Sequence, residues 1–204
     1  MFITFEGGEG TGKSTHVKRL ALDLSSMGYD VLATREPGGH PACEILRQLV
    51  LKQEWEHLTE MLLFVASRHE HCKKVIEPAL ARGQIVLCDR FMDSTVAYQG
   101  YGLGLSLELM SVLHKHVVTT LPDFTIILDV DPEVGQKRIA KRRDNNHIDD
   151  RSKDFHNRVR EGLLMIAKND EKRCVVVDAS PSLEEVYDVL FKKIILILKG
   201  AQQC

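Results

Sequence analysis

The 204-residue sequence has no Cys-x-x-Cys pair, no excess of positive charge and no apolar run long enough to cross a membrane. The missing pair disfavours a metal site built from cysteines. An odd number of cysteines with no regular spacing is typical of reduced thiols. Lys and Arg total 27 against 29 for Asp and Glu, so the formal net charge of −2 disfavours a dedicated nucleic-acid-binding protein. The cysteines are scattered, at Cys43, Cys72, Cys88, Cys174 and Cys204.

The longest purely aliphatic run near the C-terminus, IILIL at 194–198, is far shorter than the roughly 20 residues that a membrane-spanning helix needs. No signal peptide precedes the first motif, which begins at residue 7. We therefore expect a cytoplasmic protein with no membrane or nucleic-acid partner. The length and the hydrophobic fraction of 44% indicate a single domain over 1–204 with a sizeable core.

Short apolar runs alternate with longer amphipathic stretches along the chain. The runs are predicted strands, at 2–5, 30–34, 84–89, 124–130 and 173–179. Most are almost continuously apolar, as expected for strands covered by helices on both faces. Helices are predicted at 14–27, 58–82 with a bend at Pro78, 105–118, 132–142, 152–168 and 183–199. The alternation predicts an α/β fold with a five-stranded parallel sheet flanked by helices.

A glycine-rich stretch, GGEGTGKS at 7–14, lies between the first predicted strand and the first predicted helix. It matches the G-x-x-x-x-G-K-[ST] pattern of a phosphate-binding loop in full and in the expected context. Its glycines allow backbone N–H groups to surround phosphate oxygens at a helix N-terminus. Lys13 adds positive charge for the β- and γ-phosphates, and the Ser14 hydroxyl can bind Mg²⁺. The pattern indicates a nucleoside triphosphate without specifying the reaction.

The guanine-reading N-K-x-D pattern of GTPases is missing, and motor or helicase ATPases usually need a longer chain. Among proteins with a phosphate-binding loop, this leaves a small kinase, one that transfers the γ-phosphoryl group to a small acceptor. Asp89 ends a buried predicted strand, at the sheet edge where ligands gather, and can orient Mg²⁺ opposite Ser14. Arg90 follows it and can pair with an acceptor phosphate, with a structural ion pair as the alternative role.

The sequence resembles the thymidylate kinase family, bacterial type, in four stretches: FEGGEGTGKST at 5–15, TREPGG at 34–39, DRFMDSTVAYQG at 89–100 and PDFTIILDVDPEVGQKR at 122–138. The resemblance covers Met1 to about Leu198. It implies the P-loop NTPase fold, transfer of phosphate from ATP to dTMP with Mg²⁺ as cofactor, and a homodimer. Apolar faces at 58–66 and 105–117 are candidates for the dimer contact, although core packing explains the same residues.

On the donor side, the resemblance implies that the loop and a lid hold ATP. The predicted ATP-binding residues are Gly7, Gly8, Glu9, Gly10, Thr11, Gly12, Lys13, Ser14, Thr15, Arg138 and Arg143, and the predicted metal ligands are Ser14 and Asp89. The predicted catalytic residues are Lys13, Arg90 and Arg142. No general base is required, because the acceptor phosphate is already ionised and catalysis depends on positioning and on cations.

The polar stretch KRRDNNHIDDRSKD at 141–154 breaks the alternation and is predicted to be an exposed lid between two helices. In the bacterial type that the sequence resembles, the lid carries the arginine that the phosphate loop lacks. Residues 7–12 hold no arginine here, whereas 138–143 hold three. A solvated basic surface is the alternative interpretation. His147 stands where many relatives carry arginine, and Arg151 or Arg158 could compensate.

On the acceptor side, the predicted dTMP-binding residues are Glu9, Arg35, Pro37, Phe64, Arg68, Arg90, Thr95, Tyr98 and Gln99. Phe64 and Arg68 lie four residues apart, on one face of a predicted helix. The resemblance implies that Phe64 stacks on thymine and that Arg68 contacts the base, whereas Phe64 alone would be read as a core residue. Thr95 and Gln99 match positions that line the base pocket.

The sugar and phosphate of the acceptor are assigned to other residues. Glu9 is predicted to contact the 3′-hydroxyl, with charge balance against an arginine as the alternative. Tyr98 is predicted to bound the sugar or to exclude a ribose 2′-hydroxyl, with simple packing as the alternative. Arg35 and Pro37 lie just beyond the second predicted strand, where Pro37 shapes a tight turn.

Two other functions stay open. One is a kinase for another nucleoside monophosphate or for a deoxynucleoside, against which the threonine and glutamine at 95 and 99 favour thymine. The other is a non-enzymatic nucleotide-binding switch, which the intact Lys13, Ser14 and Asp89 disfavour.

Overall fold

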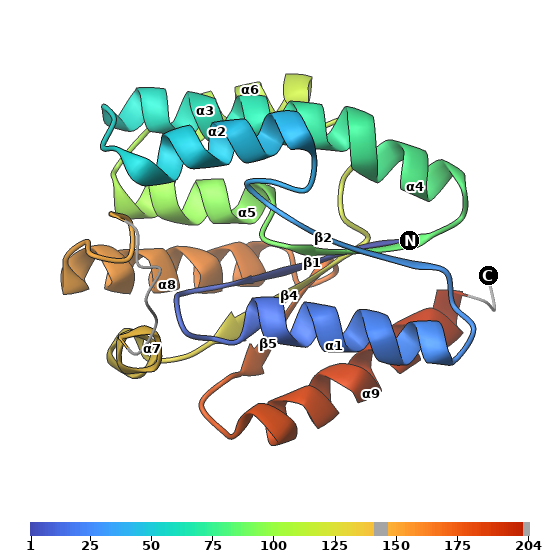
Figure 1. Ribbon diagram of the computed structural model, residues 1–204. Helices are drawn as coiled ribbons and strands as arrows, with labels where there is room; N and C mark the ends of the chain where they lie inside the picture. Colours follow the sequence, from blue (N-terminus) through green and yellow to red (C-terminus); the bar gives the residue numbers. More distant parts are fainter. Residues whose placement is uncertain (141–146, 202–204) are drawn as a thin grey trace.

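The computed structural model describes residues 1–140 and 147–201. Five parallel strands form one sheet in the order β2-β3-β1-β4-β5, with helices on both faces (Figure 1). The strands are β1 Phe2–Gly7, β2 Val31–Arg35, β3 Ile85–Asp89, β4 Phe124–Asp129 and β5 Cys174–Asp178. The predicted α/β fold is confirmed, and all five predicted strands are found at their predicted places.

The helices follow the predicted ones closely in most places. They are α1 Lys13–Ser26, α2 Pro41–Lys52, α3 His57–His71, η1 Cys72–Ile76, α4 Glu77–Ala81, α5 Met92–Thr95, η2 Val96–Gly102, α6 Leu107–Val117, α7 Pro132–Ile139, α8 Lys153–Asn169 and α9 Leu183–Ala201. The predicted helix at 58–82 corresponds to α3, η1 and α4 in succession. Pro78 follows the wide π-helical turn η1, where a regular helix would press its ring against the carbonyl of Lys74.

Two helical segments were not predicted from the sequence. The first, α2, begins at Pro41, a residue that is accepted only in the first turn of a helix. The second, α5 with η2, ends in a segment with two glycines and therefore has low intrinsic helix propensity. Packing holds it, since a Cβ added to Gly102 would lie 2.5 Å from the Phe155 ring of α8.

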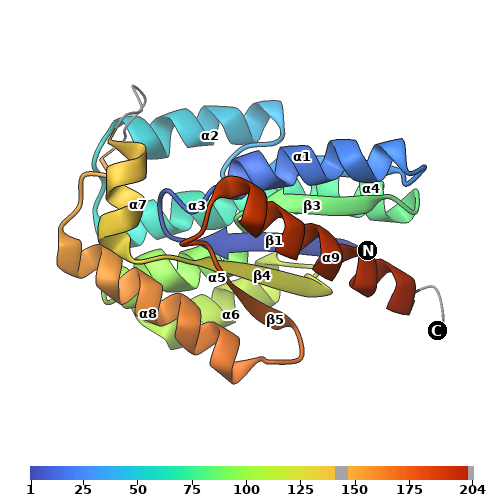
Figure 2. The same ribbon diagram turned by 90° about the horizontal axis from the view of Figure 1, so that it is seen from below.

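The direction of each crossover decides which face of the sheet its helix covers. α1 leads from β1 to the edge strand β2, whereas the later crossovers lead back to β3 and then on towards β5. Because crossovers between parallel strands are right-handed, α1 covers one face, and α2 to α6 with α8 cover the other (Figure 1). α9 follows β5 and returns to the face of α1 (Figure 2), where Leu190 shares a buried cluster with Ile3, Phe5 and Leu20.

The reversal of direction places a crevice at the carboxyl ends of β1 and β3. These two strands are neighbours, and their crossovers leave in opposite directions. Such a point is the usual ligand site of an open α/β sheet. The glycine-rich loop follows β1, and Asp89 and Arg90 stand at the end of β3. The fold thus brings the two sequence motifs to one place.

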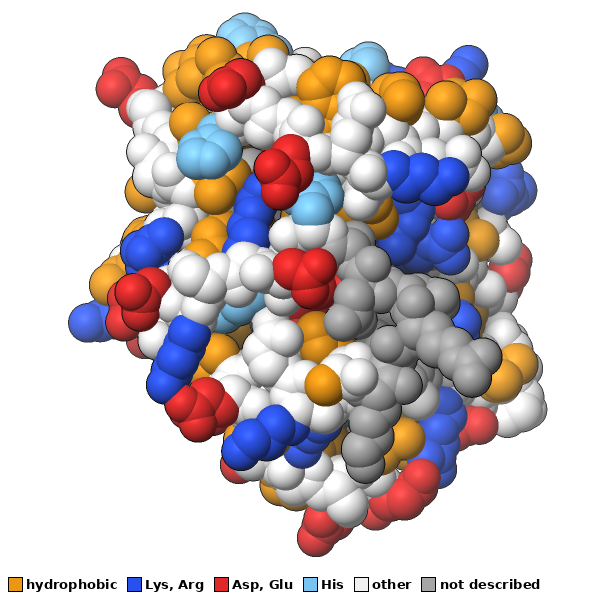
Figure 3. Space-filling model, turned by 60° about the vertical axis from the view of Figure 1, so that its left-hand side comes forward, with side chains coloured by type: hydrophobic (Ala, Val, Ile, Leu, Met, Phe, Trp, Pro, Cys, Tyr) orange, Lys and Arg blue, Asp and Glu red, His pale blue; other side chains and the backbone are white. Residues whose placement is uncertain are grey.

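No helix within the described ranges is long and apolar enough to span a membrane. Basic and acidic side chains are interspersed over the face that Figure 3 shows.

The contact between the glycine-rich loop and α7 yields a stability prediction. A Cβ added to Gly135 would stand 2.3 Å from the carbonyl oxygen of Glu9, so Gly135→Ala should lower the free energy of unfolding by about 1–3 kcal/mol. Gly200→Ala is the matched control, because its Cβ would meet nothing within 4 Å. Urea unfolding of both variants checks this, and equal stability of the two would contradict the close packing.

Candidate active site

Lys13 lies beneath the loop that joins β1 to α1. Gly12 begins the helix in the left-handed region, at φ 86°, a conformation that glycine adopts without strain. The Lys13 ammonium donates to the carbonyl oxygens of Gly7 at 3.0 Å and Gly8 at 2.6 Å, and to Thr11 Oγ1 at 3.1 Å. Burial, together with the charge of nearby Arg90, lowers the pKa of Lys13 to about 8 against the opposing effect of its acidic neighbours. The positive charge of Lys13 is thus held beside the N-terminus of α1.

Ser14 and Asp89 meet across the crevice between β1 and β3. The Ser14 hydroxyl, in the first turn of α1, donates a hydrogen bond to Asp89 Oδ2. A hydroxyl and a carboxylate are the hard oxygen ligands that Mg²⁺ accepts, with phosphate oxygens completing its shell. Among the described residues, no group of three or more His, Cys, Asp or Glu side chains could hold a metal alone. The pair therefore fits an ion that is bound together with a phosphate ligand.

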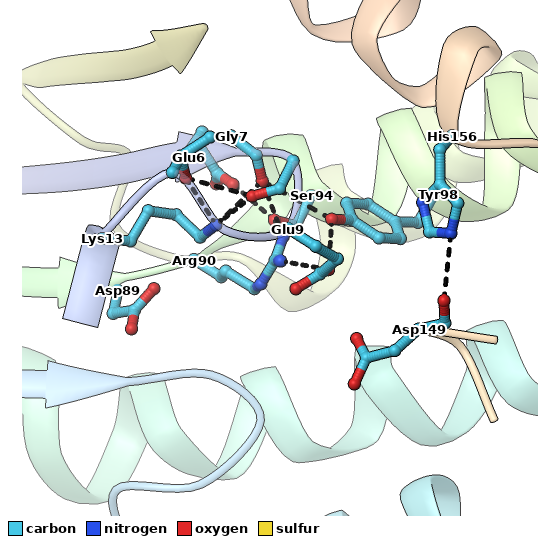
Figure 4. A network of polar contacts seen from close by, with 12 residues as sticks. Glu6, Gly7, Glu9, Lys13, Asp89, Arg90, Ser94, Tyr98, Asp149 and His156 are labelled. Atoms are coloured by element: carbon cyan, nitrogen blue, oxygen red, sulfur yellow. Dashed lines mark hydrogen bonds and ion pairs between the residues drawn. The ribbon is translucent and has the colours of Figure 1, made fainter. Parts of the chain in front are cut away.

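Arg90 connects the loop to the opposite wall of the crevice (Figure 4). Its backbone lies in the left-handed region at φ 68°, which is uncommon for a residue with a side chain. Its guanidinium donates to Glu9 at 2.6 Å, to the Gly7 carbonyl at 3.1 Å and to Ser94 at 3.2 Å. The same group lies 4.7 Å from the centre of the Tyr98 ring. These contacts fix the guanidinium beside the phosphate loop.

Glu9 is held ionised by its neighbours. It accepts hydrogen bonds from Arg90 and, at 2.7 Å, from the Tyr98 hydroxyl. Burial by itself would raise the pKa of Glu9, but the charges of Arg90 and Lys13 outweigh it and lower the pKa to about 2. The carboxylate therefore remains an acceptor at neutral pH, directed into the same space as Arg90 (Figure 4).

One cavity of about 340 Å³ joins these parts. All nine residues predicted to hold the acceptor nucleotide line it, together with Lys13, Ser14 and Asp89. The structure therefore brings the predicted acceptor set, the loop lysine and the predicted metal ligands to one place. Lys13, Arg68 and Arg90 bring several positive charges to this cavity, so two anionic ligands can be held close to each other.

Arg68 is the most deeply buried of the arginines that line the cavity. Its guanidinium is 2% exposed and donates to Glu36 at 2.7 Å, to Thr95 at 2.9 Å and to the Phe91 carbonyl at 3.0 Å. His114 stands 3.3 Å from the same group. A guanidinium has five N–H groups, so these four contacts leave one for a ligand in the cavity. Burial and Arg68 lower the pKa of His114 to about 3, which keeps its ring neutral and able to accept from Arg68.

Of the remaining predicted residues, Arg138 and Thr15 are described by the structure, whereas Arg142 and Arg143 are not. Arg138 is not among the residues that line the cavity; it donates to the carbonyl oxygens of Ala179 and Ser180, both at 2.8 Å, and to that of Gly10 in the loop at 3.4 Å. Thr15 is exposed in the first turn of α1. Arg142 and Arg143 lie outside the described residues, as does the first part of the predicted lid at 141–154.

Sequence reasoning missed several residues of the site. Glu6 is buried and accepts hydrogen bonds from Ser94 and, at 2.8 Å, from the backbone of Phe91. Burial, with repulsion from Asp93, raises the pKa of Glu6 to about 7. A carboxylate at the end of an apolar strand was a signal that could have identified it. Arg47 also lines the cavity, and it was missed because it lies on the unpredicted helix α2.

Comparison with known proteins gives a consistent result. A family model described as "Thymidylate kinase" matches residues 5–189. The chain is 47% identical over 189 residues to a thymidylate kinase of Caulobacter vibrioides, covering 91% of each chain, and 39% identical to one of Geobacillus thermodenitrificans, covering 99% of this chain and 92% of that one. The crystal structure of thymidylate kinase from Ehrlichia chaffeensis is similar with a TM-score of 0.79 and 38% identity, covering 97% of this chain and 98% of the other.

The lowered pKa of Lys13 predicts that ATP affinity falls above pH 8. Only the protonated ammonium attracts phosphate, so each pH unit above the pKa should weaken ATP binding by about tenfold. Equilibrium binding of ATP between about pH 7 and pH 9.5 measures this. Lys13→Gln cannot titrate and should bind ATP weakly without that slope; an equal slope in the variant would contradict the assignment.

Proposed function

Given that the chain belongs to the thymidylate kinase family and transfers phosphate from ATP to dTMP to form dTDP, we propose that Lys13, Arg90 and Arg142 carry the transfer step. The acceptor oxygen belongs to a phosphate that is already ionised, so the enzyme has no proton to remove. Its task is to bring two polyanions together and to stabilise charge on the transferred group.

The observation that supports this proposal best is the single cavity. Lys13, Arg68 and Arg90 all line the same space. A nucleoside monophosphate bound with its base at Arg68 would direct its phosphate towards Arg90 and the loop. Arginine suits that position because its planar guanidinium can bind two phosphate oxygens at once.

We assign the acceptor contacts residue by residue. Phe64 stacks on the thymine ring, and the free N–H of Arg68 donates to a base carbonyl, with Thr95 and Gln99 at the base edge. Glu9 accepts from the 3′-hydroxyl, a role that its lowered pKa supports.

Three further residues surround the sugar and phosphate of the acceptor. Tyr98 is held by its hydrogen bond to Glu9 and bounds the sugar on the side of a ribose 2′-hydroxyl. Arg35, the last residue of β2, and Pro37 just after it also line the cavity and complete the acceptor set.

Ser14 and Asp89 are the proposed protein ligands of Mg²⁺. Their direct contact at the mouth of the loop supports this assignment. Mg²⁺ bound there neutralises charge on the β- and γ-phosphates. Lys13 and the N–H groups at the start of α1 hold the same phosphates, so the donor is fixed before the acceptor approaches.

The donor side includes residues whose assignment rests on the sequence. Arg138 and Arg143 are proposed ATP contacts, together with the loop from Gly7 to Thr15. We assign Arg142 to the transferred phosphoryl group, since the loop itself holds no arginine at 7–12. In this proposal, residues 1–204 form one domain, and about 141–154 act as its lid.

A homodimer and a cytoplasmic location complete the proposal. Exposed aliphatic side chains support the dimer, at Leu58 and Leu62 on α3 and Leu109 and Val112 on α6. These two helices share a buried cluster and present one side to solvent; the sedimentation mass of the purified chain tests this. The four described cysteines are free and buried, as is usual in a reducing compartment.

An acceptor panel tests the reaction. With ATP and Mg²⁺, we expect kcat/KM for dTMP to exceed that for dUMP by about tenfold, because dUMP lacks one methyl group. It should exceed the values for CMP, dGMP and thymidine by about 100-fold or more. ADP release measures all of them. Faster turnover of another acceptor would reject the assigned base contacts, and ATP binding without turnover would favour a switch.

The same assay tests Arg142. Arg142→Ala should lower kcat by about 1,000-fold, since an arginine at a transferred phosphoryl group contributes at least that much. KM for dTMP should change little, because the acceptor contacts remain. Arg82→Ala is the control, as Arg82 ends α4 and pairs with Gln84. An unchanged kcat in Arg142→Ala would remove this residue from the catalytic set.

A further inference from the structure

A buried carboxylate stands behind Gln99, one of the residues assigned to the base edge. Glu60, on α3, is 0% exposed and belongs to neither the loop nor the acceptor set. Its Oε1 accepts a hydrogen bond from Gln99 Nε2 at 2.9 Å. Its Oε2 accepts from Arg151 Nη2 at 2.5 Å, and His147 Nε2 lies 3.4 Å away. A fully buried carboxylate is therefore held in place from the side opposite to Gln99.

The chemistry of Glu60 decides which way the Gln99 amide turns. A side-chain amide has a donor end and an acceptor end that can exchange places by rotation. Glu60 is a carboxylate in its ion pair with Arg151, and a carboxylate only accepts. The NH₂ group of Gln99 must then face Glu60. The carbonyl oxygen is the end left for a ligand in the cavity, which Gln99 lines.

The exposed end of that amide matches one kind of pyrimidine. Thymine and uracil carry an N3–H donor, whereas cytosine carries an N3 acceptor beside an exocyclic amine. A carbonyl oxygen fixed at the base edge accepts from the N3–H of thymine and repels the lone pair of cytosine. A buried acceptor without a donor is unfavourable, so the orientation alone would discriminate between the two bases.

Arg151 supplies the cation that this arrangement needs. Its side chain is 17% exposed and lies 4.9 Å from the Phe155 ring, which limits its movement. His147, at the position where the resemblance leads us to expect arginine, reaches the same carboxylate only at 3.4 Å. Arg158 donates to the Gly102 carbonyl instead. Of these two arginines, Arg151 is therefore the one that contacts Glu60.

We propose that Glu60, held by Arg151, is a positioning residue that fixes the carbonyl oxygen of Gln99 towards the base and thereby sets the preference for thymine over cytosine. The proposal rests on the assigned acceptor site and extends it beyond residues that touch the ligand. The alternative is that Glu60 and Arg151 only join α3 to the segment before α8. A selectivity ratio separates these two roles, because a purely structural contact would affect both bases alike.

The test compares kcat/KM for dTMP, dUMP and dCMP in Glu60→Gln. The new amide has nearly the same shape but can donate as well as accept, so Gln99 is free to turn. We expect kcat/KM for dTMP and for dUMP to fall by about tenfold each, the effect of losing one hydrogen bond. The value of kcat/KM for dCMP should stay unchanged or rise. Using dUMP with dCMP removes the effect of the thymine methyl group. KM for ATP should stay within about twofold.

Variants at Arg151 keep the proposal testable if Glu60→Gln folds poorly. Arg151→Met removes the cation and should lower the ratio of kcat/KM for dUMP to kcat/KM for dCMP. Arg151→Lys keeps a positive charge and should restore most of that ratio. Lys153→Met is the matched control, because this exposed cation pairs with Glu133 and not with Glu60. Thermal unfolding of each variant reports folding separately.

The outcomes are distinct. If Glu60→Gln and Arg151→Met lower kcat/KM for dUMP and for dCMP by the same factor, the pair is structural and the proposal is overturned. If the unmodified enzyme itself does not prefer dTMP and dUMP to dCMP, the assigned base contacts fail, and the proposal fails with them for a different reason.

Discussion

The ion pair between Arg90 and Glu9 connects the two halves of the site. Glu9 belongs to the loop after β1 and Arg90 follows β3, so the 2.6 Å contact ties the phosphate loop to the end of β3. Both side chains are 18% exposed, and a buried charge without a partner is strongly unfavourable. Each residue therefore constrains the other, and the left-handed backbone at Arg90 is kept by these contacts. The positions of Tyr98 and Ser94 depend on the same guanidinium.

A second charged side chain that lines the cavity is held by its partners in the same way. Arg68 is held by Glu36, and Glu36 is held in turn by His71, which stands 3.0 Å away. Cations that are fixed before the ligand binds need no rearrangement when charge develops during transfer. This suits a reaction between two polyanions better than a general base would. The site is thus a set of placed charges, built at the point where the sheet reverses its direction of winding.

Much of the fold was accessible from the sequence because it depends on local pattern. Apolar runs identified all five strands, and the glycine-rich motif located the loop before α1. The segment 92–102 was different, since its glycines disfavour a helix and only contact with α8 holds it in helical form. Arg47 was lost with α2, which is different again, because its helix-forming residues follow Pro41, a residue that fits the first turn of a helix. Local propensity failed where tertiary packing overrode it.

The sequence by itself determined the loop and the strands, and its resemblance to a family pointed to nine predicted acceptor residues, which line one cavity. Only the tertiary structure decided which residues support them. Glu60 and Arg151 are 91 positions apart, and Glu6 and Ser94 are 88 apart. No periodicity or spacing records such pairs, because they exist only after the crossovers have brought separate elements together. The orientation of the Gln99 amide follows from one of them, and for that physical reason no sequence pattern could have revealed it.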